Sequence, residues 1–102
     1  MQYHKLVRDR IPEIIRANGQ VALTCKLDEA EYQAALEAKL HEEVAEFCES
    51  RESAELADIV EVVYALAAAQ GMAETALNEM RQHKRAERGG FVEKIFLIET
   101  QR

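Results

Sequence analysis

The chain has 102 residues and a formal net charge of −6, and hydrophobic residues make up 48% of it. This length is typical of one domain, so we expect residues 1–102 to form a single domain. The acidic balance argues against a nucleic acid polymer as the partner, because duplex binding needs a net basic footprint.

The cysteines and the apolar segments favour the cytoplasm as the location of this protein. Cys25 and Cys48 lie far apart and form no C-x-x-C pair, and no apolar segment follows the charged N-terminal residues. The longest mostly apolar run, 62–72, is too short to span a bilayer. We therefore expect a cytoplasmic protein with reduced thiols and no membrane partner.

Proline, glycine and capping residues divide the first half of the chain into elements. Pro12 suits the first turn of a helix and Gly19 suits its end, which predicts a short helix over 11–18. Residues 21–27 are β-biased and predict a short strand. Asp28 is suited to cap a long helix that runs to about residue 49.

The second half continues in the same way. Ser53 is placed to cap a helix over 54–70, and Gly71 fits the position after its end. A further helix is expected over 73–88, before a pair of glycines. Residues 91–98 predict a second strand, which could pair with the first. The predicted fold is therefore mainly α, with a two-stranded β appendage at most.

The helix predicted over 54–70 is apolar on more than one side. Ile59 and Val63 share one face, whereas Val60 and Tyr64 lie away from it. Such a helix is normally covered on both sides, and no other part of the chain is large enough to cover both. We therefore expect a helical bundle that is completed by oligomerisation, as a homodimer or a tetramer.

Two acidic spacings are the main chemical feature, E-E-x-x-E in the first long helix and E-x-x-D in the next. Residues three apart lie on the same side of a helix. Glu43 falls inside an apolar stripe and Glu46 on its edge, while Glu55 and Asp58 are placed in the same way on the next helix. An unpaired buried carboxylate costs several kcal/mol. A divalent cation held by all four would resolve both intrusions.

The chemistry of these acids favours Mg²⁺, which prefers hard oxygen ligands and bridges protein carboxylates to phosphate oxygens. Glu42 opens the first motif but points furthest from the apolar stripe, so a supporting role at the metal stays open. A solvated acidic face on two helices is the alternative for the whole set. Glu61 lies opposite the Ile59 face and is expected to be solvated.

Basic residues would neutralise the phosphates that a metal does not reach. Lys39 lies one turn before Glu43, and Lys84 and Arg88 lie beside the pair of glycines. These three are the candidate substrate-binding residues. Basic residues also favour a helix C-terminus, so a structural role for the last two stays open. The N-terminal cations Lys5, Arg8 and Arg10 are likewise open between phosphate contact and a structural role.

The two acidic motifs together resemble those of the all-α nucleotide pyrophosphohydrolases, which include MazG, dimeric dUTPases and phosphoribosyl-ATP pyrophosphohydrolase. The stretches K-L-V-R-D-R-I-P-E at 5–13 and R-G-G-F at 88–91 look like the flanks of a compact MazG-like subgroup. The gap between Glu46 and Glu55 is shorter than in MazG itself.

The resemblance implies a Mg²⁺-dependent enzyme, with Mn²⁺ as a substitute. Such an enzyme hydrolyses a nucleoside triphosphate at the α-phosphorus to a nucleoside monophosphate and pyrophosphate, in the house-cleaning of nucleotide pools. Glu43, Glu46, Glu55 and Asp58 would be its catalytic metal ligands. The alternatives are a phosphoribosyl-ATP pyrophosphohydrolase of histidine biosynthesis and a non-catalytic helical dimer that serves as an interaction module.

Overall fold

The computed structural model describes residues 3–102 and contains four α-helices within them. The helices are α1 (Ile11–Ala17), α2 (Glu29–Ser50), α3 (Ser53–Ala69) and α4 (Glu74–Arg88). Each helix begins and ends within one residue of its predicted bounds, so the mainly α architecture is confirmed.

The helix α2 begins at the residue that the sequence indicates. Asp28 accepts a hydrogen bond from the backbone N–H of Glu31 at 2.8 Å, and the Glu31 carboxylate accepts one from the backbone N–H of Asp28 at 3.1 Å. This reciprocal capping box satisfies two donors that the first turn of a helix leaves free. The predicted cap at Asp28 is confirmed.

The helix α3 ends at Ala69, one residue before the predicted end, and Gly71 closes it as predicted. Gly71 has a φ of +79°, its N–H donates to the carbonyl of Ala68, and the N–H of Met72 donates to the carbonyl of Ala67, both at 2.9 Å. This is the paired hydrogen-bond pattern of a Schellman motif, in which glycine adopts the left-handed conformation at no steric cost.

The predicted cap of α3 is wrong by one residue. Glu52 holds the extended cap position and makes no side-chain capping bond, whereas Ser53 is already helical. The reason is the short connection: α2 closes on Arg51 in the left-handed conformation, with a φ of 61°, so α3 begins almost at once.

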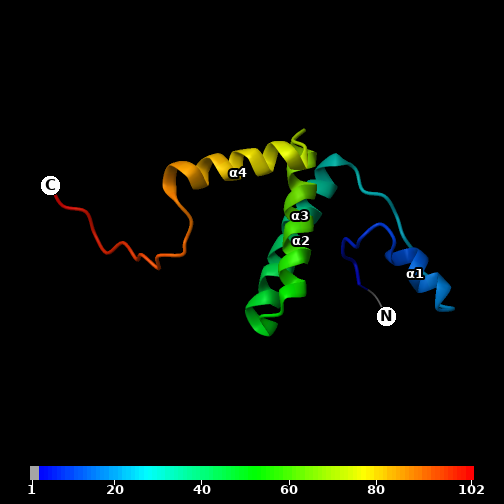
Figure 1. The fold of residues 1–102 in the computed structure, drawn as a ribbon. Coiled ribbons are helices and arrows are strands. Elements are labelled where there is room, and N and C mark those ends of the chain that lie inside the picture. Colours follow the sequence, from blue (N-terminus) through cyan, green and yellow to red (C-terminus); the bar gives the residue numbers. More distant parts are fainter. Residues whose placement is uncertain (1–2) are drawn as a thin grey trace.

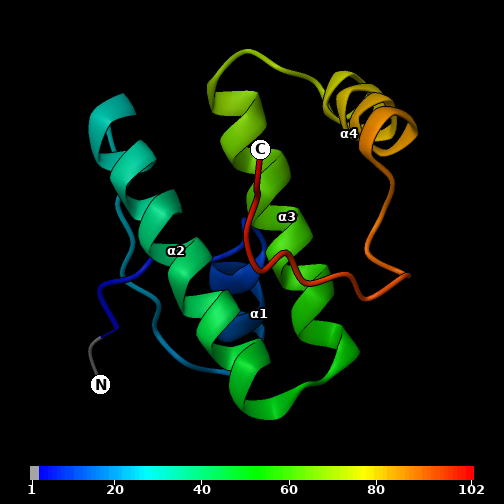
Figure 2. The ribbon, with the colours of Figure 1, turned by 90° about the vertical axis from the view of Figure 1, so that its left-hand side faces the viewer.

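The helices α2 and α3 form an antiparallel hairpin, and α4 turns away from α3 by 108° (Figures 1 and 2). Leu36, Val62 and Ala67 are the buried apolar residues of this hairpin. The Tyr64 hydroxyl and the Asn78 amide join α3 to α4 at 3.0 Å. Within residues 3–102 no single helix is long and apolar enough to cross a membrane, although α3 and α4 together meet that test as a bent pair.

The described chain is elongated. Its radius of gyration is 18.0 Å and its principal extents are 63 × 32 × 22 Å, whereas a compact domain of this length has a radius of gyration of about 13 Å. Leu56 and Val60 on α3 stay nearly half exposed. A single chain therefore covers only part of its apolar surface.

The predicted β appendage is wrong for the described residues, which contain no strand. The segment over 21–27 leads from α1 to the start of α2, whereas the segment over 91–98 extends from the far end of α4 (Figure 1). Neither pairs with a neighbouring strand, and an isolated strand is not stable in water. Leu23 is 93% exposed and Ile98 is 88% exposed.

Candidate functional site

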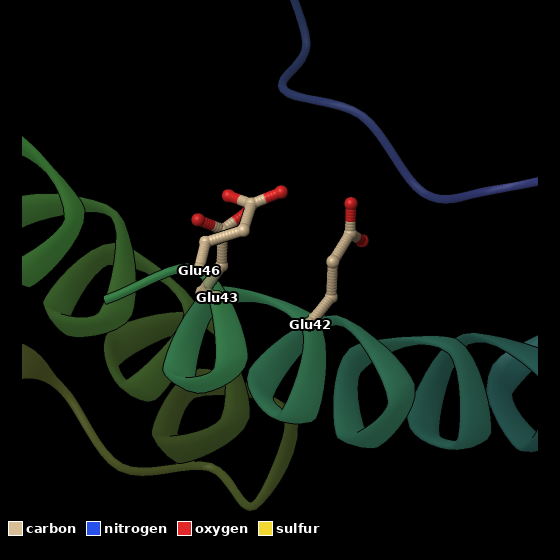
Figure 3. A group of neighbouring side chains, drawn as sticks. All are labelled: Glu42, Glu43 and Glu46. Carbon is tan, nitrogen blue, oxygen red and sulfur yellow. The ribbon is translucent and has the colours of Figure 1, made fainter. Parts of the chain in front are cut away.

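Three glutamates, Glu42, Glu43 and Glu46, project from one side of α2 (Figure 3). The helix is continuous from its capping box to its left-handed end, so the spacing of the acidic motif keeps these side chains together. One carboxylate oxygen from each lies within 4.8 Å of the others. The first predicted acidic group is therefore present in the fold.

The helix α3 brings a second acidic group against the first. Oxygens of Glu43, Glu55 and Asp58 also lie within 4.8 Å of one another. Because Glu43 belongs to both groups, four other carboxylates from two helices lie around it. This confirms the predicted convergence of the two motifs, which follows from the antiparallel pairing of α2 and α3.

Glu43 is the buried member of this acidic cluster and is only 6% exposed. One of its oxygens, Oε1, lies 3.2 Å from Nζ of Lys39. The other, Oε2, is buried and has no hydrogen-bond partner in the described part of the chain. A buried acceptor without a partner costs about 1–3 kcal/mol, and more when it is charged. The predicted intrusion of Glu43 into the apolar face is confirmed.

Lys39 lies inside the cluster, as predicted for a residue one turn before Glu43. Its Nζ is 3.3 Å from Oε2 of Glu42 in addition to its contact with Glu43, and its side chain is 17% exposed. Partial burial acts to lower the pKa of Lys39, but the hydrogen bonds and charges of the two glutamates outweigh burial and raise it. Lys39 therefore stays protonated.

Two cations of the N-terminal segment form salt bridges with acids of the cluster. Nη2 of Arg8 is 2.6 Å from Oδ1 of Asp58, and Nζ of Lys5 is 3.4 Å from Oε1 of Glu42. Figure 3 shows this segment passing over the side from which the glutamates of α2 project. The sequence leaves the roles of Lys5 and Arg8 open. In the fold, both side chains contact carboxylates of the cluster.

Charge is unevenly balanced across the cluster. Burial and then the carboxylates of Glu46, Asp58 and Glu43 raise the pKa of Glu55 above its usual range. Partial burial also acts to raise the pKa of Glu42, but its lysine partners outweigh burial and lower it. Within residues 3–102 no lysine or arginine forms a salt bridge with Glu46 or Glu55. The excess negative charge therefore lies between Glu43 and the start of α3.

The donor set fits a hard divalent cation. Mg²⁺ takes carboxylate oxygens as ligands, and Glu43, whose Oε2 has no partner in the described chain, belongs to both acidic groups. A cation there would satisfy that buried oxygen and offset the repulsion that acts on Glu55. The residues suited to hold it are Glu43, Glu46, Glu55 and Asp58, with Glu42 at the edge of the group.

Lys84 and Arg88 lie elsewhere in the chain. Together with Arg81, Arg85 and the start of the C-terminal tail, they line an open basic groove of about 520 Å³ at the end of α4. The helix α4 leads away from the hairpin (Figures 1 and 2). Asp58 is already separated from the last residue of α3 by a helical rise of about 16 Å. The fold of one chain does not bring these two residues to the acids.

Comparisons with known proteins add one local similarity. A protein of Mycolicibacterium smegmatis described as "Uncharacterized protein" is 62% identical over 42 residues, which are 41% of this chain and 43% of that protein. The match thus spans less than half of this curated relative's length. No family model and no solved structure matches the chain.

Proposed function

We propose that this chain is a Mg²⁺-dependent nucleotide pyrophosphohydrolase. It takes a nucleoside triphosphate and water and yields a nucleoside monophosphate and pyrophosphate. The water oxygen bonds to the α-phosphorus, and the bond from that phosphorus to the α–β bridging oxygen breaks. The electron pair of that bond leaves on pyrophosphate. Mn²⁺ is expected to support the same reaction in place of Mg²⁺.

The buried Oε2 of Glu43 is the single observation that carries the proposal. A solvated acidic face has no reason to bury a carboxylate, yet Glu43 is 6% exposed and has one oxygen without a partner in the described chain. Burying such a group is costly, and a bound cation would satisfy the oxygen that has no partner. The resemblance of the two acidic motifs to the pyrophosphohydrolases supplies the reaction.

Each acid has a defined part in this proposal. Glu43, Glu46, Glu55 and Asp58 bind Mg²⁺, which when bound activates water and neutralises phosphate charge. Carboxylate oxygens that are not used as ligands are available to accept the proton that the attacking water loses. The partly buried Lys39 holds the orientation of Glu43 through their 3.2 Å contact and adds positive charge beside the phosphates.

The proposed enzyme is an oligomer in which helices of two or more chains complete the bundle. The elongated shape and the exposed apolar residues of α3 support this arrangement. A second subunit is also needed if Lys84 and Arg88 are to bind substrate, because they lie away from the acids of their own chain. A homodimer is the simplest assembly, and a tetramer is its natural doubling.

A turnover screen tests this proposal. Purified protein is incubated with a panel of nucleoside triphosphates and phosphoribosyl-ATP, with Mg²⁺, with Mn²⁺ or with EDTA, and pyrophosphate and orthophosphate are measured separately. Pyrophosphate release that needs the metal is expected for at least one substrate. Absence of turnover on the whole panel would favour the non-catalytic helical dimer.

A further inference from the structure

The N-terminal segment brings one solvent-accessible guanidinium to the acidic cluster. Arg8 lies 50 residues from Asp58 in sequence, yet its Nη2 is 2.6 Å from Oδ1 of that residue. The Arg8 side chain is 53% exposed, whereas that of Lys39 is 17% exposed. A ligand that arrives from solvent can therefore reach Arg8 more readily than Lys39.

We propose that Arg8 is a substrate-binding residue that contacts the phosphate tail of the nucleotide. This inference rests on the proposed function, because it assigns Arg8 to the substrate of the same site. It also differs from the sequence-based expectation, in which Lys39, Lys84 and Arg88 are the substrate-binding cations. The fold brings Arg8 to the acidic cluster, whereas Lys84 and Arg88 line the basic groove at the end of α4.

The chemistry of the guanidinium supports this role. Arginine has five N–H donors in a planar fork that matches phosphate oxygens, and one hydrogen bond, to Asp58, joins Arg8 to the cluster. When a divalent cation shares the Asp58 carboxylate, the attraction between Arg8 and Asp58 weakens. The donors that Asp58 does not occupy are then available to a phosphate bound at the cation.

The net charge of the site also supports a phosphate-binding role for Arg8. Five carboxylates meet three cations in the cluster, which leaves a net charge of −2. One divalent cation would bring this sum to zero, and a polyphosphate would then bring negative charge of its own. Glu43 is buried and its Oε2 has no partner in the described chain, whereas Arg8, which contacts Asp58 of the same cluster, is 53% exposed.

Calorimetric titration of inorganic triphosphate into the full chain tests the inference. Wild type, Arg8→Gln, Arg8→Lys and the control Arg10→Gln are compared in saturating Mg²⁺, and Mg²⁺ alone is titrated into each. Arg10 is the matched control, since it is exposed, two residues away and in no salt bridge of the described chain.

Arg8→Gln should weaken triphosphate binding about 10- to 100-fold, as expected for loss of a charge-assisted hydrogen bond. Arg8→Lys should fall in between, because it keeps the charge and loses the fork. Arg10→Gln should bind as wild type does. The affinity for Mg²⁺ alone should be undiminished or higher in Arg8→Gln, because a cation that competes for Asp58 is gone.

Three results would overturn the inference: wild type that does not bind triphosphate, Arg8→Gln that binds it as tightly as wild type, or a Mg²⁺ affinity that falls together with triphosphate affinity. A joint fall in both affinities would mean that Arg8 only holds Asp58 in position. If Arg8→Gln fails to fold, Arg8→Lys decides on the same criteria. Turnover of wild type is scored separately, so a protein that binds triphosphate through Arg8 but hydrolyses no nucleotide refutes the proposed function alone.

Discussion

Replacing Glu43 by glutamine separates a metal ligand from a surface acid. The substitution keeps the size of the side chain and removes its charge. In the metal-free protein, Glu43 is buried among four other carboxylates with one oxygen unpartnered in the described chain. We expect Glu43→Gln to make the metal-free protein more stable and to remove catalysis, which is the trade-off typical of a functional site.

The size of the gain follows from two opposing contributions. Removing the charge from a buried, unpartnered carboxylate relieves about 1–3 kcal/mol. Loss of the contact with Lys39 reduces this gain, but Lys39 keeps its second partner, Oε2 of Glu42, at 3.3 Å. A net gain of about 1 kcal/mol remains, which raises Tm by about 4–8 °C in a domain of this size.

Addition of Mg²⁺ should reverse the order of the two proteins. At a hundredfold excess over its dissociation constant, Mg²⁺ stabilises the wild type by about 2.7 kcal/mol, or about 11–22 °C in Tm. If the loss of the shared ligand Glu43 weakens Mg²⁺ binding a hundredfold, the same concentration stabilises the variant by about 0.4 kcal/mol, or about 2–3 °C.

Thermal melts in EDTA and in Mg²⁺, at one protein concentration, measure all four values. Glu49→Gln is the matched control, since Glu49 is an exposed glutamate of α2 that belongs to neither acidic group. The control should melt like the wild type in both buffers. A Glu43→Gln protein that also does so would refute the assignment of Glu43 to the metal.

Three further predictions concern the remaining acids, the assembly and pH. Alanine at Glu46, Glu55 or Asp58 should each remove most pyrophosphate release, whereas alanine at the exposed Glu61 should leave it largely intact; equal losses at Glu61 would show that the site is misassigned. Sedimentation at micromolar concentration should detect no stable folded monomer, and a monodisperse folded monomer would contradict the proposed oligomer. The raised pKa of Glu55 means that the metal-free folded state holds a proton more tightly than the unfolded state, so stability should fall as pH rises from the ordinary glutamate pKa through the raised one. Urea unfolding of metal-free Glu55→Gln should lack this decline and be more stable than wild type at neutral pH; a parallel pH dependence in both proteins would rule out Glu55 as its cause.

The helices of this fold could be predicted because their signals are local. Asp28 caps α2 through its own neighbour Glu31, and Gly71 closes α3 through hydrogen bonds within six residues. The two strands could not be predicted in the same way, since a strand needs a partner for its backbone groups. Residues 21–27 and 91–98 have the composition of strands, but the fold of one chain keeps them apart.

The acids of the site could be predicted because helical spacing fixes which side each occupies, and the pairing of α2 with α3 brings both motifs together. The N-terminal cations could not, because a segment without regular structure has no period. Lys5 and Arg8 meet partners 37 and 50 residues away, which only the tertiary path of the chain determines.

Hydrolysis in ¹⁸O-labelled water tests the central claim most directly. The wild type is incubated with its best nucleoside triphosphate and Mg²⁺, and both products are analysed by mass spectrometry. Attack of water on the α-phosphorus places the label in the nucleoside monophosphate and leaves pyrophosphate unlabelled, and EDTA abolishes both products. Label in pyrophosphate or in orthophosphate, or turnover that persists in EDTA, would contradict the account.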